Sequence, residues 1–242
     1  PALVAGLVGY MLFRSRIQGV YFAIVTQALT AIVALLLIGQ QRLINGTNGI
    51  TEMKTIFGHS LSEHNTKIGL YIATVTVLAI VYIISRYIIR SRFGRVLIAV
   101  RDDEERTRFT GYNPAFVKTV VFMISAAIAG IAGALFTPQV GIISPTQLDI
   151  VASIEIVIWV AVGGRGTLIG AVLGAIVVNL GKSTISSANP DIWQLIMGLL
   201  FVGVVMVFPK GIVGTIQDLF SRIRKLETKK TAVSMHVAEV ES

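Results

Sequence analysis

Long apolar stretches separated by short polar ones make up most of the sequence. A helix rises 1.5 Å per residue, so about 20 apolar residues cross a hydrocarbon core of roughly 30 Å. The second, third and fourth stretches below reach this length. The pattern predicts an all-α, polytopic transmembrane helical bundle with about seven membrane segments: Pro1–Phe13, Gly19–Gly39, Ile68–Ile89, Phe116–Pro138, Ile150–Val162, Leu168–Leu180 and Ile192–Phe208.

The fifth and sixth stretches are short and are separated by the glycine-rich segment Gly163–Thr167. They are either short tilted spans or the two halves of a broken hairpin buried among other helices. We favour the short spans. The first stretch begins at Pro1, without a methionine and already apolar, so we expect a fragment that lacks its N-terminal portion.

Composition supports a membrane protein. Hydrophobic residues make up 54% of the chain and charged residues 14%, with a mean hydropathy of +0.77. A soluble domain carries nearer to 25% charged residues, because water must solvate its surface. The 23 glycines fit membrane helices that pack closely. The absence of cysteine excludes disulfides, thiolate metal sites and cysteine nucleophiles.

The positions of Lys and Arg predict the orientation. If the turn Arg14–Ile17 faces the cytoplasm and the spans alternate, 17 of the 21 basic residues fall inside. The positive-inside rule then places the C-terminus in the cytoplasm and explains the net charge of +8 without nucleic acid. The four remaining basic residues fall outside: Arg42, Lys54, Lys67 and Lys182.

The same alternation divides the chain into a transmembrane domain over residues 1–214 and a cytoplasmic tail over residues 215–242. The polar segment 40–67 forms an external loop, and the densely charged segment 90–117 forms an internal one. The tail is basic and has the composition of a disordered end. No part of the chain accommodates a soluble catalytic domain.

A string that resembles a P-loop and the three histidines are the features that could indicate catalysis or metal binding, and neither matches the pattern required. The string Gly181-Lys182-Ser183-Thr184 resembles the end of a nucleotide-binding P-loop, but Ile176 stands where the motif needs glycine. The chain is therefore not expected to bind ATP itself. The three histidines, His59, His64 and His236, lie outside the spans, and no cluster of further ligands accompanies them. We expect no metal, no cofactor and no enzymatic activity.

The internal loop contains a predicted short helix over Arg92–Gly111, closed by the glycine. Opposite charges recur four residues apart, at Arg101/Glu105, Asp102/Arg106 and Glu104/Arg108. Its apolar residues cluster at the two ends. Periodicity alone leaves two interpretations open, which are a solvated connector and a charged knob presented to a cytosolic partner. The apolar residues are Val96, Leu97, Val100 and Phe109.

Small residues recur at helical spacing in the fourth and sixth stretches, which predicts closely packed helices. The fourth carries Ala126, Gly130 and Ala134, and the sixth carries Gly170 and Gly174.

Glu155 is the only acidic residue well inside a predicted span. A charge at that depth is costly, so it is either a pathway group or a member of a structural hydrogen bond whose partner the sequence does not reveal. Gln27 and Asn179 are weaker candidates of the same kind.

Several strings resemble the permeases of branched-chain amino-acid-type ATP-binding-cassette importers, over most of the chain up to about Gly214. They are Gly19–Leu29, Asn45–Thr51, Phe93–Gly111, Ser125–Leu135 and Ser153–Gly170. Within that family, four strings are most similar to the urea importer permease: Val100–Arg106, Pro138–Pro145, Ile158–Thr167 and Phe208–Gly211.

The resemblance implies a permease subunit of a urea importer in the bacterial inner membrane, with a second homologous permease, two cytoplasmic ATPase subunits and an external solute-binding protein as partners. Urea is neutral, so its path needs polar partners without a fixed charge pair, and Gln27, Glu155 and Asn179 are the candidates. The resemblance also implies an ATPase-coupling segment at Arg101, Asp102, Asp103, Glu104, Glu105, Arg106 and Gly111.

Three alternatives remain open. In the first, the substrate is a branched-chain amino acid or a short amide; a binding pocket for a zwitterionic amino acid would need paired charges. Alternatively, the protein is a passive channel or a membrane scaffold without transport. The family's permeases extend further at the N-terminus than this chain.

Overall fold

The computed structural model describes residues 1–17, 19–40, 46–50, 55–56, 59–61, 63–164 and 166–186, with shorter pieces beyond them. These pieces are 195–196, 198–200, 202–203, 206, 211 and 214–215. The chain divides into two compact units, Pro1–Ile150 and Val151–Ser242. Each unit is described by itself.

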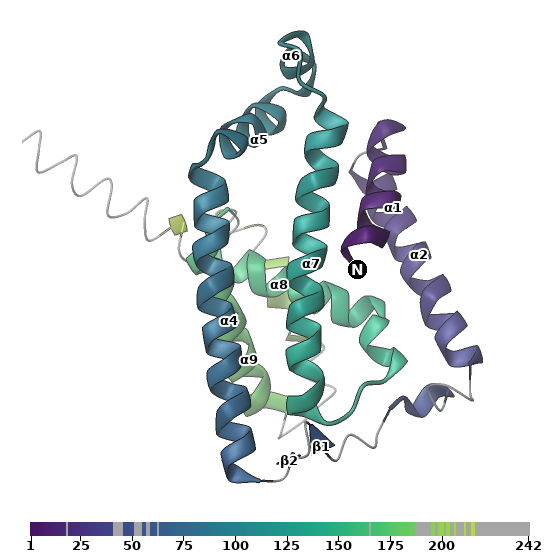
Figure 1. The fold of residues 1–242 in the computed structure, drawn as a ribbon, viewed down its shortest axis with the longest axis vertical. Helices are drawn as coiled ribbons and strands as arrows, with labels where there is room; N and C mark the ends of the chain where they lie inside the picture. The colour runs from purple at the N-terminus through teal and green to yellow at the C-terminus, as the bar shows by residue number, and fades with distance from the viewer. Residues whose placement is uncertain are drawn as a thin grey trace, which may run out of the picture. The chain divides into compact units, whose positions relative to one another are not determined.

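The first unit consists mainly of helices (Figure 1). These are α1 (Ala2–Arg14), α2 (Val20–Gly39), α4 (His64–Arg90), α5 (Arg92–Asp102), α6 (Glu104–Phe109) and α7 (Pro114–Val140), with two short 3-10 helices, η1 (Gly46–Asn48) and η2 (Pro145–Leu148).

The described part of the chain is all-helical, as predicted, apart from a short ribbon in the external loop. There β1 (Thr55–Ile56) and β2 (His59–Ser60) pair antiparallel, with Thr55 opposite Ser60 and Ile56 opposite His59. The ribbon arises because extended backbone in a loop gains hydrogen bonds by pairing with itself.

Helices α1 and α7 pack antiparallel through small residues. A Cβ added at Gly6 would meet the side chain of Met123, and one at Gly9 would meet Phe122. Beside this contact, the rings of Phe13, Phe22 and Phe122 form a cluster with centroids 5.2–6.0 Å apart, which adds α2 to the pair. Glycines let the two backbones approach, and the aromatic rings fill the space beside them.

The two ends of this unit differ in structure. At one end, Ile50 and Ile143 exchange backbone hydrogen bonds of 2.9 and 3.1 Å, which joins the chain after η1 to the chain before η2. At the other end, the C-terminus of α1 lies beside the N-terminus of α7, near α6. The two loops assigned to the outside therefore meet at one end, and those assigned to the inside meet at the other.

The second unit is built on α8 (Ile150–Gly163) and α9 (Leu168–Ser186). Their contact is close, because a Cβ at Gly163 would overlap the carbonyl oxygen of Gly170, and one at Gly174 would overlap that of Trp159. Buried Ile158, Val162 and Val178 form its apolar core.

Four of the described helices are long and apolar enough to cross a membrane, namely α2, α4, α7 and most of α9. The apolar helices α1 and α8 are shorter, with 13 and 14 residues. The sixth segment is longer than predicted. Helix α9 continues through Gly181 to Ser186, about 28 Å in all, and Lys182 in this last part pairs with Glu155 on α8. Most of the seventh stretch and of the tail lies outside the described residues, so seven spans stay a prediction.

Candidate coupling element and membrane ion pair

The charged internal loop begins with a sharp turn from α4 into α5. The Ser91 hydroxyl accepts a hydrogen bond from the Gly94 backbone N–H at 3.3 Å and so caps α5. A Cβ at Gly94 would overlap the carbonyl oxygens of Ile88 and Ile89. Glycine at this position therefore lets the two helices join at a tight angle.

A single helix over Arg92–Gly111 is not what forms, and that prediction is wrong. Asp103 leaves the helical conformation with φ −156° and ψ 103°, and it separates α5 from α6. Its carboxylate accepts from the Arg106 N–H at 2.9 Å, which makes it the N-cap of α6. The capping hydrogen bond replaces continued helix, since a short acidic side chain satisfies the free N–H groups of a new helix. Gly111 follows α6 with φ +90°, so the predicted glycine stop is present.

Helix α6 is fastened to α7 by an ion pair that the sequence analysis did not anticipate. Lys118 Nζ donates to Glu104 Oε2 at 2.5 Å, and the two side chains are 25% and 21% exposed. Thr107 is buried, and its hydroxyl donates to the Asp103 carbonyl at 2.8 Å. The ion pair therefore holds α6 against the start of α7, and the Thr107 hydrogen bond stabilises the first turn of α6.

The outward face of α5 and α6 is charged and open to solvent. Arg101 pairs with its neighbour Asp102, and Arg106 pairs with Asp103, rather than with residues four positions away. These pairs are exposed and contribute little to stability. The Phe109 ring, 90% exposed, lies at the end of α6. An exposed aromatic side chain beside unburied charges suits contact with another protein.

Glu155 has a partner in the second unit. Lys182 Nζ lies 2.6 and 2.9 Å from the two carboxylate oxygens of Glu155, so a bidentate ion pair joins α8 and α9. The Glu155 side chain is 15% exposed and that of Lys182 is 40% exposed. The distribution of basic residues places Lys182 outside the membrane and indicates no partner for it. It escaped notice as a partner because 27 residues separate the two positions.

The other two pathway candidates, Asn179 and Gln27, form no ion pair. Asn179 is exposed, and its amide donates to the Ala175 carbonyl at 2.8 Å, within its own helix. Gln27 is half-buried on α2 in the first unit. Sequence reasoning missed Trp159, which lies one helical turn after Glu155. Its indole Nε1 is buried and has no hydrogen-bond partner among the described residues.

No three His, Asp or Glu side chains gather to hold a metal ion within the described ranges. The first unit carries the Glu104–Lys118 pair and the capped α6, and the second unit carries the Glu155–Lys182 pair.

A set of membrane-length helices joined to a charged helix pair at one end is typical of a class, the multi-pass membrane proteins. Comparison with known proteins identifies the family. The family model "branched-chain amino acid transport system / permease component" matches residues 1–205, and the chain belongs to this family of transport permeases, which are not enzymes.

Individual relatives agree with this family. The high-affinity branched-chain amino acid permease protein LivM of Salmonella typhimurium is 28% identical over 234 residues, covering 87% of this chain and 55% of its own length. LivH of Escherichia coli is 29% identical over 163 residues, with 66% and 52% covered. The ribose import permease RbsC of Haemophilus influenzae is 20% identical over 219 residues, with 88% and 66% covered.

The chain thus spans about half the length of these amino acid permeases. No solved structure matches it. The names of these relatives refer to amino acids and ribose, so they lend no support to the expected urea specificity.

Proposed function

We propose that the protein is the permease subunit of an ATP-binding-cassette importer that carries branched-chain amino acids across the bacterial inner membrane. Its partners are a second homologous permease, two cytoplasmic ATPase subunits and an external solute-binding protein. The family match over residues 1–205 and the likeness to LivM and LivH support this proposal. The permease domain covers residues 1–214, and the tail over residues 215–242 lies in the cytoplasm.

The coupling function falls to α5 and α6. A partner ATPase pushes on the permease only through an element that is both exposed and stiff. Glu105, Arg106 and Phe109 supply the exposed surface, while Glu104 holds the element to α7 through its ion pair with Lys118. Of the predicted coupling set, the exposed Arg101 and Asp102 also belong to the contact, and Asp103 and Gly111 shape its two ends.

The ion pair between Glu155 and Lys182 carries the choice of substrate. A zwitterionic amino acid presents an ammonium and a carboxylate. Its ammonium can replace Lys182 as the partner of Glu155, and its carboxylate can replace Glu155 as the partner of Lys182. The Trp159 N–H adds a donor one turn away. Neutral urea gains no such exchange. Asn179 supplies a further polar group on α9, and Gln27 is the pathway candidate on α2 of the first unit.

Urea remains a second candidate, favoured by the four strings that resemble the urea permease. The most extensive is Ile158–Thr167, which covers the end of α8 and the turn into α9. A passive channel is disfavoured by the rigid cytoplasmic element, which a channel does not require.

The test is uptake of labelled leucine and labelled urea in cells that express the intact permease or its variants, before and after energy depletion. We expect energy-dependent leucine uptake, reduced about tenfold or more by Glu155→Gln and by Lys182→Met, because either change leaves one charge unpaired. The matched control is Glu63→Gln, an exposed carboxylate at the start of α4, which should transport normally.

Loss of urea uptake alone in cells without the gene would replace the amino acid assignment with the urea one. Uptake that survives energy depletion would favour the channel. Normal leucine transport by both pair variants would remove Glu155 and Lys182 from the path.

A further inference from the structure

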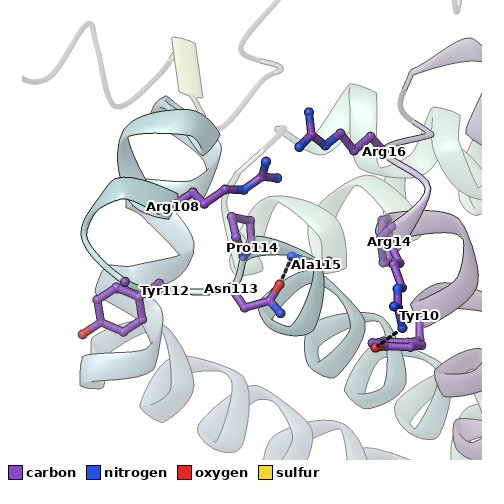
Figure 2. Close-up of a pocket in the computed structure, with 10 residues that line it drawn as sticks. Tyr10, Arg14, Arg16, Arg108, Tyr112, Asn113, Pro114 and Ala115 are labelled. Atoms are coloured by element: carbon purple, nitrogen blue, oxygen red, sulfur yellow. Dashed lines mark hydrogen bonds between the residues drawn. The ribbon is translucent and has the colours of Figure 1, made fainter.

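A cavity of about 620 Å³ lies in the first unit, where α1 ends and α7 begins (Figure 2). Three of its ten lining residues are arginines, Arg14, Arg16 and Arg108, and none is acidic. The ion pairs found among the described residues join other cations to Asp102, Asp103, Glu104 and Glu155, and none of them includes one of these three guanidinium groups. The paired cations are Arg101, Arg106, Lys118 and Lys182.

Arg14 is positioned without loss of its charge. Its Nη1 donates to the Tyr10 hydroxyl at 3.0 Å, and its guanidinium carbon lies 5.7 Å from the centre of the Tyr10 ring. Both contacts are with a neutral partner. The remaining N–H groups of Arg14 stay available for an anion.

Arg16 occupies an unusual backbone conformation. Its φ of +56° lies in the left-handed region, and it is the only non-glycine residue in the described chain with positive φ. Glycine or asparagine adopts this conformation with less strain. The turn itself therefore does not call for arginine. In Figure 2, the Arg16 and Arg108 side chains point toward one another from opposite walls, over the buried ring of Pro114.

Like charges that point into one cavity repel each other unless an anion lies between them. The guanidinium group binds phosphate oxygens in pairs and is weakly hydrated, which makes arginine suited to phosphate at the edge of a membrane. Arg14 and Arg108 lie at the end assigned to the cytoplasm, where anionic lipid headgroups are concentrated.

We propose that this cavity binds a phosphate group through Arg14, Arg16 and Arg108. The phosphate belongs either to an anionic phospholipid of the cytoplasmic leaflet or to free inorganic phosphate. Its place between α1, α6 and α7 makes the bound phosphate a bridge between the membrane helices and the coupling element.

The experiment uses the intact permease, purified in its native assembly, in two arms. The first measures binding of phosphatidylglycerol in nanodiscs of phosphatidylcholine by native mass spectrometry. The second measures the Tm in phospholipid-free detergent, with inorganic phosphate compared with chloride at equal ionic strength. The test variant is Arg14→Gln/Arg16→Gln/Arg108→Gln. The matched control, Arg90→Gln/Arg92→Gln/Arg95→Gln, removes three exposed arginines that do not line the cavity.

We expect the test variant to bind the lipid at least about tenfold more weakly than the control, because each arginine near the surface contributes about a fivefold factor and only the test set lines the cavity. A phosphate-induced rise in Tm that the test variant lacks identifies free phosphate as a ligand. Loss in the nanodisc arm alone identifies the lipid headgroup.

A further variant, Arg16→Gly, separates loss of the binding site from misfolding. It relieves the strained φ, so the protein should fold at least as well, yet lipid binding should weaken about fivefold. Equal binding by the test and control variants in both arms would overturn the proposal. The proposal would also be overturned if the test variant still bound phosphate but lost the ATPase subunits. The cavity would then be a contact site for another protein.

Discussion

Single residues determine how closely the helices of this protein approach. In the second unit, Gly163, Gly170 and Gly174 bring the backbones of α8 and α9 together, and a side chain at any of them would strike backbone atoms or Thr167. Backbone atoms cannot move aside as the end of a flexible side chain can. The ion pair between Glu155 and Lys182 depends on this approach, because both side chains extend from the same two helices.

The first prediction concerns this contact. Gly174→Ala should lower the free energy of unfolding by about 1–3 kcal/mol, since its Cβ would overlap the Trp159 carbonyl. Gly181→Ala on the same helix meets no atom within 4 Å and should stabilise by about 0.5–1 kcal/mol through helix propensity. Denaturant unfolding of the purified protein in detergent measures both. A loss of stability for both variants would mean that helix α9 tolerates no substitution, and the argument from close approach would fail.

At the scale of elements, the break at Asp103 creates a separate helix whose two faces differ. The inward face carries Glu104 and the buried Thr107, and the outward face carries Glu105 and Phe109. A six-residue helix is not stable alone, so its order comes from the cap and from the contact with α7. Attachment to α7 and exposure, which the proposed coupling function requires, therefore reside in different residues.

The second prediction separates these faces. Glu104→Gln should weaken the pair with Lys118 by about 1–2 kcal/mol, which raises amide hydrogen exchange over residues 104–109 about 5–30-fold. Glu105→Gln, which removes an exposed carboxylate from the same helix, should change exchange less than about twofold. Hydrogen–deuterium exchange by mass spectrometry measures this. Equal protection in both variants would show that the ion pair does not order α6.

At the scale of the whole molecule, the first unit has a consistent polarity. The antiparallel packing of α1 on α7 places Arg14 and Asn113 at one end, where α6 also lies. The bridge between Ile50 and Ile143 closes the opposite end. This arrangement agrees with the alternation of the predicted loops between two ends. The distribution of Lys and Arg is what predicts that the α6 end lies in the cytoplasm.

The third prediction tests that orientation. Because the chain contains no cysteine, single cysteines can be introduced without background. A cysteine at the exposed Asn48 should react with a membrane-impermeant thiol reagent in intact cells, and one at the exposed Glu105 should react only after permeabilisation. Glu105 is chosen for the cytoplasmic label because it is exposed, whereas Thr107 on the same helix is buried and would not react. The reverse labelling pattern would invert the topology.

Much of the fold could be read from the order of residues. In lipid, every backbone polar group must be satisfied within the chain, so apolar stretches of sufficient length become helices. The predicted stretches Pro1–Phe13, Gly19–Gly39 and Phe116–Pro138 correspond to α1, α2 and α7 within a few residues. The family resemblance was also visible in the strings, and the family model agrees with it. The urea specificity, inferred from shorter strings, has no such support.

The sequence alone thus determined where helices form, because that depends on local hydropathy. The partner of Glu155, 27 residues away, and that of Glu104, 14 residues away, were decided only by the tertiary structure, since helix packing brings distant side chains together. The Asp103 break carried a local signal, an acidic residue followed by two glutamates at a helix start. Whether it caps a new helix or continues the old one depends on the contacts that hold α6 against α7.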